Sequence, residues 1–213
     1  SVFSLSLFPA ANNHKANAAH RTAQTLCVVF PLPTTHAMAA TFLGLVKSRH
    51  SCRHFDTSVP ITEEQLMSIL SAANCAPSVG DLQAYDICVV RDAEKKEALA
   101  HAAHGQTFLG RAAAVLVFSA EADRSAVKYG KRGSRLYCIQ DATIACAYAQ
   151  LAAHASGLGS CWVGAFKEAL VAQVVGIPDG ARPVALLAVG APKPGWVPHT
   201  MRRRSLPELV HAE

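Results

Sequence analysis

The sequence lacks any apolar run long enough to cross a membrane. Its 213 residues are 51% hydrophobic, but Gly, Ser, His or a charged residue interrupts every apolar stretch before it reaches the roughly 18 residues that a spanning helix needs. The hydrophobic content still allows a sizeable core, and the length suggests one domain with a short appendage. We therefore expect a soluble globular protein with no membrane partner.

Paired cysteines and aromatic platforms are also missing. The cysteines are odd in number, are scattered through apolar segments and form no CxxC motif, which argues against a disulfide framework and against a zinc ribbon, and favours a reducing compartment. Aromatic residues make up 7% of the chain and do not alternate with cations, so the sequence offers no base-stacking surface for nucleic acid. The seven cysteines are Cys27, Cys52, Cys75, Cys88, Cys138, Cys146 and Cys161.

Acidic residues are absent before Asp56, although the chain as a whole carries a formal charge of +5. Residues 1–45 are rich in Ala, Ser, Thr, Asn and His and resemble an organellar transit peptide, with the mitochondrion as one destination. A plain extension that packs on the domain surface is the alternative. We therefore divide the chain into an N-terminal extension (1–45) and a domain (46–213), and expect a cytoplasmic or organellar location.

The common motifs that cradle phosphates or present a nucleophile do not occur. The glycines form neither GxxxxGK[ST] nor GxGxxG, and there is no GxSxG, so the usual phosphate loops and the nucleophile elbow are excluded. Five of the nine residues from Lys47 to Phe55 are nevertheless Lys, Arg or His, and a second basic group stands at 202–204. A large core with basic segments and no cluster of catalytic side chains suggests that a bound cofactor carries the chemistry.

His50, Cys52 and His54 are candidate metal ligands by their spacing. His50 and His54 are four residues apart with Cys52 between them, and on a helix both imidazoles would share one face, as in many zinc sites. However, Arg49 and Arg53 would repel a cation, and no nearby carboxylate could orient either imidazole. We therefore expect no metal ion.

Hydrophobic periodicity predicts alternating helices and strands from residue 46 onward. The irregular alternation favours an α+β fold with helices packed on one central mixed β-sheet. The helix expected over 134–156 is apolar around much of its circumference, so a central position or a subunit interface must cover it. Helices are predicted over 61–74, 93–103, 134–156 and 167–175, and strands over 86–90, 113–119, 161–164 and 182–189.

Four motifs, in this order, resemble those of the FMN-dependent nitroreductase family. Residues 49–56 (RHSCRHFD) are similar to the family's Arg-x-Ser-x-Arg/Lys-x-Phe, and residues 76–85 (APSVGDLQAY) to its APSxxNxQPW-like loop. A Gly-Leu-Gly turn then leads to WVGAF at 162–166, and the basic group at 202–204 precedes a Leu-rich end. The resemblance covers about residues 46–210 and implies a nitroreductase-like fold and a homodimer with flavin at its interface.

The resemblance also implies how the basic residues are used. Arg49 and Ser51 would meet the FMN phosphate and ribityl chain, and Arg202 and Arg204 would complete a phosphate clamp. Arg53 would lie near N1 and O2 of the isoalloxazine and support the negative charge of reduced flavin electrostatically. The resemblance implies no other catalytic side chain.

The remaining predicted contacts come from the two loops. Pro77, Ser78 and Asp81 would line the flavin ring, and the backbone N–H groups around Gly164 and Ala165 would point at N5, since small residues permit a close approach. The full predicted cofactor-binding set is Arg49, His50, Ser51, Arg53, Pro77, Ser78, Asp81, Gln83, Val163, Gly164, Ala165, Arg202 and Arg204.

The implied reaction has two steps. NADH or NADPH reduces FMN and leaves, and a small-molecule electron acceptor such as a nitroaromatic or a quinone then takes the electrons. Two departures stand out: Asp81 replaces the family's usual Asn, and Ala84 with Tyr85 replaces Pro-Trp, as in a shorter branch of the family. The alternatives are a flavin-dependent dehydrogenase, a reductive dehalogenase, or a non-catalytic protein that binds flavin or nucleic acid.

Overall fold

The computed structural model describes residues 35–199 and 201–211, with residues 35–40 described in their backbone only. Most of the extension predicted at 1–45 therefore lies outside the described residues. Residues 39–213 form one compact folding unit. Helix α1 (Thr35–Ser48) leads into this unit and crosses the domain boundary expected after residue 45.

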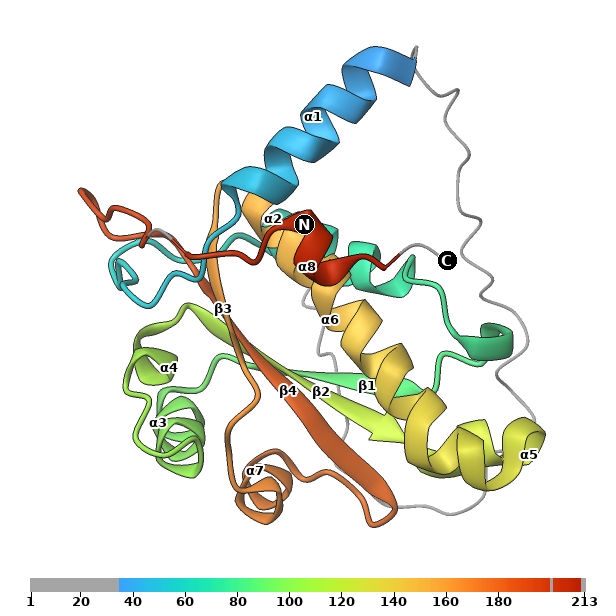
Figure 1. Ribbon diagram of the computed structural model, residues 1–213. Helices are drawn as coiled ribbons and strands as arrows, with labels where there is room; N and C mark the ends of the chain where they lie inside the picture. The colour runs from blue at the N-terminus through green and yellow to red at the C-terminus, as the bar shows by residue number, and fades with distance from the viewer. Residues whose placement is uncertain (1–34, 200, 212–213) are drawn as a thin grey trace, which may run out of the picture. The chain divides into compact units, whose positions relative to one another are not determined.

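Four antiparallel strands form the central sheet in the order β1-β2-β4-β3 (Figure 1). All three strand pairings are antiparallel, so the α+β architecture is confirmed but the expected mixture of strand directions is wrong. The helical connections between β1 and β2, and between β3 and β4, return the chain to the end of the sheet that it left, which reverses the strand direction. The strands are β1 (Tyr85–Val90), β2 (Ala114–Glu121), β3 (Gly159–Val163) and β4 (Ala181–Gly190).

Helices cover both faces of the sheet. Along β2, Leu116 and Phe118 face the core shared with α2 and α6, whereas Val115 and Val117 face the core shared with α3, α4 and α7. This alternation is the period of two that a strand buried on both faces requires. The helices are α2 (Glu63–Asn74), α3 (Ala93–Ala102), α4 (Phe108–Arg111), α6 (Cys138–Ala155) and α7 (Glu168–Val175).

The predicted start of the first helix of the domain is confirmed in detail. The Thr62 side chain accepts a hydrogen bond from the backbone N–H of Gln65, and the Gln65 side chain accepts one from the backbone N–H of Thr62, each at 3.1 Å. This capping box satisfies two of the N–H groups that a helix start leaves unpaired. The helix predicted over 61–74 is therefore confirmed, with its first helical residue at Glu63.

The helix predicted over 134–156 differs at its start. Regular α6 begins at Cys138, after a π-helical turn (Gly133–Tyr137) and helix α5 (Ala122–Arg132), which the sequence analysis did not predict. Gly130 has φ +53°, so it breaks the regular helical path before α6. The C-terminal part of the prediction is confirmed, because α6 ends at Ala155, just before Gly157.

The long helix α6 takes a central position, one of the two arrangements that its apolar surface allowed. Its small residues Ala142, Ala145 and Ala149 are fully buried in the same core cluster as Leu116 and Phe118 of the sheet. Figure 1 shows α6 running across one face of the sheet from the end near α5 to the end near α1. Among the residues described, no helix is both long and apolar enough to cross a membrane.

Candidate functional site

The basic segment is the non-helical stretch that follows α1, residues 49–55. It lies along the sheet in an extended conformation. Ser51 forms a parallel bridge with Ser160 of β3, and the N–H of Cys52 donates to the carbonyl of Ser160 at 2.8 Å. Cys52 and Phe55 are buried, while Arg53 is exposed. Because the apolar side chains of the segment point into the core, its cations remain at the surface beside β3.

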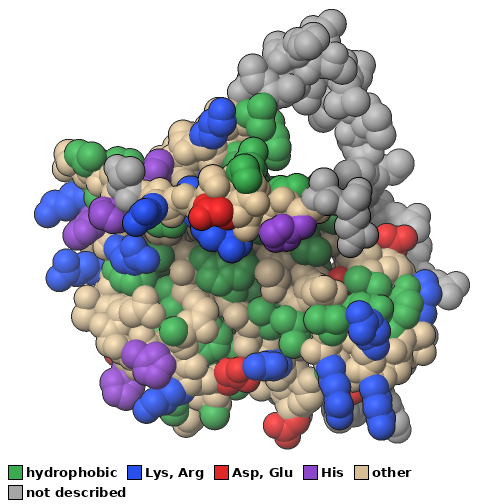
Figure 2. Space-filling model, in the orientation of Figure 1, with side chains coloured by type: hydrophobic (Ala, Val, Ile, Leu, Met, Phe, Trp, Pro, Cys, Tyr) green, Lys and Arg blue, Asp and Glu red, His purple; other side chains and the backbone are tan. Residues whose placement is uncertain are grey.

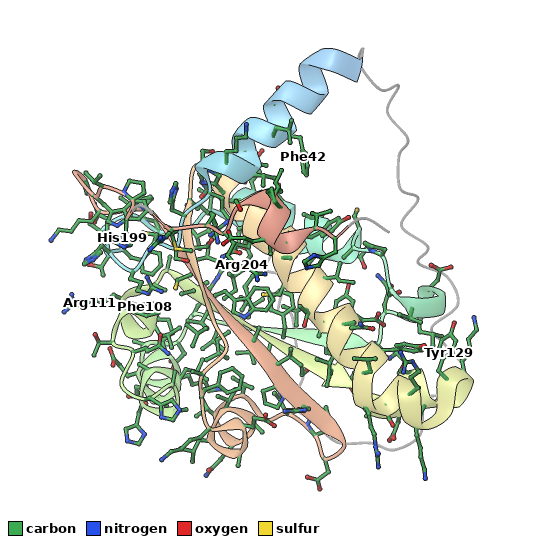
Figure 3. All side chains as sticks on the ribbon, in the orientation of Figure 1. Phe42, Phe108, Arg111, Tyr129, His199 and Arg204 are labelled. Atoms are coloured by element: carbon green, nitrogen blue, oxygen red, sulfur yellow. The ribbon has the colours of Figure 1, made fainter. Side chains whose placement is uncertain are left out.

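Arg49 borders a hollow of about 420 Å³, which we call the Arg49 hollow. Within the described chain, Arg203 is the member of the C-terminal triplet that lines it, and Arg204 lies apart, next to α8 (Leu206–Leu209), as Figure 3 shows. A cluster of guanidinium and imidazole groups suits a dianionic phosphate. The hollow is lined by Val46, Lys47, Arg49, His50, Met201 and Arg203.

The imidazoles of this segment do not form a metal site. His50 and His54 lie on the non-helical stretch, so they do not share a helix face. The ring of His50 contacts the carbonyl of Ser48 through Nδ1 at 2.8 Å. In the part of the chain that the structure describes, no three His, Cys, Asp or Glu side chains gather in a way that could hold a metal ion.

Arg53 lies where the basic segment, β3 and α4 meet. Its guanidinium carbon stands 5.9 Å from the centre of the Phe108 ring, a cation–π contact that fixes the side chain. Burial raises the pKa of the Cys161 thiol, and the positive charge of Arg53 is the first of the effects that oppose this rise. The charge of Arg53 therefore acts on the middle of β3.

The backbone after β3 is exposed where the sequence places a flavin contact. Gly164 and Ala165 are both exposed, and a Cβ added at Gly164 would meet only Nε1 of Trp162, at 3.7 Å. Gln106 donates through Nε2 to the carbonyl of Ala165 at 3.5 Å. Val163 is buried, so only its backbone can contribute. The backbone of Gly164 and Ala165 is therefore accessible to a ligand, and the hydrogen bond from Gln106 restrains it.

The loop 76–85 is held by a carboxylate from helix α6, which packs in the same core cluster. Asp141 on α6 accepts a hydrogen bond from the N–H of Val79 at 2.9 Å through Oδ1 and one from the N–H of Ala84 at 3.3 Å through Oδ2. Asp141 is fully buried. A buried carboxylate with two charge-assisted hydrogen bonds holds the loop in one conformation.

Two of the loop side chains predicted to contact the cofactor are already bonded within the loop region. Ser78 accepts the N–H of Gln83 through Oγ at 2.9 Å, and Gln83 donates through Nε2 to the backbone oxygen of Asn74 at 3.1 Å. Pro77 and Asp81 are exposed. Asp81 has φ +58°, a left-handed conformation that Asp and Asn both adopt more readily than most residues, which gives a backbone reason for Asp in place of the usual Asn.

The predicted site residues form two groups at opposite ends of α6. Ser48 is bonded to His154 near the end of α6 at 2.9 Å, which puts the basic segment at that end. Asp141, in the first turn of α6, holds loop 76–85 at the other end. The helix has 18 residues and so spans about 27 Å. Within one chain, the loop does not join the basic segment in a single site.

Three residues that the sequence analysis missed support the two groups: Asp141, Arg203 and Gln106. Asp141 had a recognisable signal, because it is the only acidic residue in the apolar stretch 138–155, and a charge in such a helix is usually buried with partners. Arg203 could not be separated from Arg202 and Arg204 by sequence. Gln106 is one of several polar residues in a loop and had no distinguishing signal.

Comparison with known proteins gives a consistent result. The sequence profile of the Nitroreductase family matches residues 46–108 and 101–191. An NADH dehydrogenase of Thermus thermophilus is 31% identical over 181 residues, covering 72% of this chain and 88% of that protein. An NADPH-flavin oxidoreductase of Vibrio harveyi is 32% identical over 154 residues, covering 69% of this chain and 64% of that protein.

Similarity to solved structures agrees with these sequence matches. The structure of the NADPH:FMN oxidoreductase from Vibrio harveyi in complex with NAD⁺ superposes with a TM-score of 0.72 at 29% identity. The match covers 80% of this chain and 76% of that one. The α+β fold described above is therefore the fold of that protein.

Proposed function

Because the chain belongs to the nitroreductase family, we propose that it is an NAD(P)H-dependent oxidoreductase that uses FMN to reduce a small-molecule acceptor. When bound, FMN would take hydride from NADH or NADPH and, after the oxidised nucleotide has left, pass the electrons to an acceptor such as a nitroaromatic or a quinone. Relatives whose names include NADPH-flavin oxidoreductase and NADPH:FMN oxidoreductase support this reaction class.

One arrangement in the structure carries the proposal: cations and exposed peptide groups border the two ends of β3. At the start of β3 lie Arg49 and Ser51, and after its end lie Gly164 and Ala165. The first pair suits a phosphate, and the second offers backbone N–H groups with open space above them. These residues fit FMN, whose phosphate and ring system need both kinds of contact.

The residues of the chain would divide the work as follows. Arg49, with the arginines at 202–204, would hold the phosphate, while Ser51 would donate to the same region. Arg53, fixed against Phe108, would supply positive charge where the ring system becomes negative. Pro77, Ser78 and Asp81 would line the ring.

We also propose a homodimer, since loop 76–85 lies about one α6 length from the basic segment of its own chain. An exposed apolar groove of about 350 Å³ runs between α1, α2 and α6, and Phe42 (labelled in Figure 3) is 56% exposed while Tyr148 is 41% exposed. A second copy would cover this surface and bring its own loop to the basic segment. The groove is lined by Phe42, Leu45, Ala72, Tyr148, Leu151, Ala152 and Ala155.

Sedimentation of the purified protein tests the dimer. Tyr148→Glu should shift the protein toward the monomer and reduce flavin content, because it places a charge in the apolar groove. Val127→Glu is the matched control, since Val127 is 90% exposed and lies on α5. A wild-type protein that sediments as a monomer at micromolar concentration would rule out the dimer.

The reaction is tested by the colour of the protein. Purified protein should absorb in the visible range of oxidised flavin, release FMN on heating and bleach with NADH or NADPH under anaerobic conditions. Added nitroaromatic or quinone should restore the colour. A colourless protein that FMN cannot reconstitute would contradict the proposal, and salt-sensitive RNA binding by such a protein would favour the non-catalytic alternative.

We propose that residues 1–45 form an N-terminal extension, and that the protein is cytoplasmic or, if this extension is a leader, organellar. We propose that the domain begins near residue 46, where the family match begins. Mass spectrometry of the N-terminus of the native protein tests this: a mature start before Phe42, which keeps the groove residues of α1, would support an organellar leader. A native chain that retains all of residues 1–45 would favour a plain extension.

A further inference from the structure

A second cationic hollow lies beside the later part of the basic segment, at residues 53–57. It has a volume of about 310 Å³, and we call it the Arg111 hollow. Three of its lining residues are cations, and no residue is shared with the Arg49 hollow. It is lined by Arg53, His54, Phe55, Asp56, Thr57, Arg111, Lys193 and Pro194.

Backbone pairing brings three distant segments together at this hollow. Phe55 bridges Pro192 in an antiparallel sense, and the N–H of Lys193 donates to the carbonyl of His54 at 2.9 Å. Arg111 enters from the end of α4 (Figure 3). The cations therefore come from separate parts of the fold and stand on a rim that regular hydrogen bonds define.

One acid, Asp56, lies among the cations of the hollow, and the positive charge of Lys193 acts on it. In the described residues, neither Arg53, Arg111 nor Lys193 belongs to an ion pair. The one carboxylate in the lining, Asp56, accepts two hydrogen bonds from Ser58, from its N–H at 2.9 Å and from its Oγ at 2.6 Å. Figure 2 shows Lys, Arg and His side chains gathered at the left edge of the view.

Two neighbouring cations, Arg91 and Lys96, differ from these three because each has a partner within the fold. Arg91, beside the adjoining hollow, pairs with Glu63, and Lys96 donates to the carbonyl of Ala112 at 2.6 Å. Those two charges are used inside the fold. The three cations of the Arg111 hollow, in contrast, remain exposed along one concave site, where an anionic ligand could meet them together.

We propose that the Arg111 hollow binds an oxyanion, a phosphate or a carboxylate, carried by the reducing dinucleotide or by the electron acceptor. Three cations line about 310 Å³ of open space, which is ample for such a group and for part of the molecule that carries it, and the guanidinium of Arg111 can hold two of its oxygens at once. Arg53 links this hollow to the proposed flavin site. The oxyanion site itself follows from the geometry; only the identity of the molecule that carries the anion rests on the proposed function.

Binding of inorganic pyrophosphate to the flavin-loaded protein, measured by calorimetry, tests the site directly. Arg111→Gln and Lys193→Gln should each weaken pyrophosphate binding about tenfold, because each removes one charge-assisted contact. Lys131→Gln, an equal change of charge on exposed α5, should leave the affinity unchanged. Equal affinity in the wild type, Arg111→Gln and Lys193→Gln proteins would overturn the proposal.

Steady-state kinetics then identifies the carrier of the anion. If the acceptor carries it, the ratio of the KM for 4-nitrobenzoate to that for nitrobenzene should rise about tenfold in Arg111→Gln, since the two acceptors differ by a carboxylate. If the dinucleotide carries the anion, the KM for NADPH should rise instead. The KM for NADH should rise as well if the group in the hollow is the pyrophosphate that both dinucleotides share. Unchanged values in both comparisons would overturn the proposal.

Failure of the proposed function would give a different result. A colourless, inactive protein whose pyrophosphate binding is still weakened by Arg111→Gln and not by Lys131→Gln would refute the flavin reaction and support the oxyanion site. An active flavoprotein with pyrophosphate binding that none of these substitutions changes would do the reverse.

Discussion

The backbone N–H of Val79 donates to Oδ1 of Asp141 at 2.9 Å, across 62 positions of sequence. The second oxygen of the same carboxylate accepts the N–H of Ala84 at 3.3 Å. A single side chain on α6 thus fixes both ends of the turn that contains Gly80 and Asp81. Asp81 and Gln83, which lie in this turn, have φ +58° and +44°, left-handed conformations that cost a non-glycine residue free energy.

Asp141→Ala should lower the free energy of unfolding by about 2–4 kcal/mol, because it leaves two backbone N–H groups without an acceptor in a buried setting. Urea unfolding followed by circular dichroism, at one fixed protein concentration, measures the loss. Asp141→Asn should lose less, since its amide oxygen can still accept one of the two bonds.

The control for this prediction is Asp179→Asn, which changes an exposed carboxylate before β4. It should leave the unfolding midpoint within experimental error. Equal midpoints for Asp141→Ala and the wild type would show that Asp141 does not fasten the loop.

Arg49→Ala should weaken FMN retention about tenfold or more, because it removes a charge-assisted contact to phosphate. Equilibrium dialysis of flavin, or fluorescence of released FMN, measures this.

The triplet at 202–204 offers a sharper comparison. Arg204→Ala should weaken FMN retention to a similar extent if the clamp follows the family motif. Arg203→Ala should do so instead if the phosphate binds in the Arg49 hollow, which Arg203 lines. Arg135→Ala, an exposed cation far along the chain, is the matched control. Full retention in all three clamp variants would show that the two basic groups do not bind FMN.

Local signals predicted most of the fold. Thr62 and Gln65 mark a helix start by their own side chains, and the apolar run before Ser119 forms a strand buried on both faces, so both elements could be read from neighbouring residues. The direction of the strands could not, because it depends on where each helical connection returns the chain. The turn before Cys138 was also missed, because residues 134–137 contain no Gly or Pro that would separate them from the Ala-rich helix after them.

The candidate site was predictable only in part. The RHSCRHFD segment carries its own pattern, and the structure places it beside β3. Which arginine of the triplet meets Arg49 depends on the path of an exposed segment after residue 200, and no local signal encodes that path. The hydrogen bond between Asp141 and Val79 joins residues 62 positions apart, so no local sequence pattern encodes it.

Arg53→Ala should slow the reduction of bound flavin by NADH or NADPH about tenfold or more, because it removes positive charge from the region where negative charge develops. FMN content should stay close to that of the wild type, since Arg53 does not line the Arg49 hollow. Stopped-flow absorbance under anaerobic conditions measures the rate, and the flavin midpoint potential should become more negative. Arg53→Lys should recover part of both losses. Wild-type reduction rates in Arg53→Ala would contradict the electrostatic role.

His154 should make the protein less stable in acid. Burial, and then the charges of Arg49 and His50, lower the pKa of His154 below its ordinary value of 6.5. Between the lowered pKa and 6.5 the unfolded chain therefore binds more protons than the folded one, so the free energy of unfolding falls as the pH falls through this window. Above pH 6.5 the penalty disappears.

The measurement that isolates this effect is urea unfolding at several pH values from 5 to 7.5. His154→Gln removes the titrating group while its carboxamide can still bond to Ser48, which lies 2.9 Å from the His154 ring, so the slope of stability against pH should become flatter. Arg49→Ala should flatten it in part, because one of the repelling charges is gone. If wild type and His154→Gln show the same slope, another group controls acid stability and the environment of His154 does not.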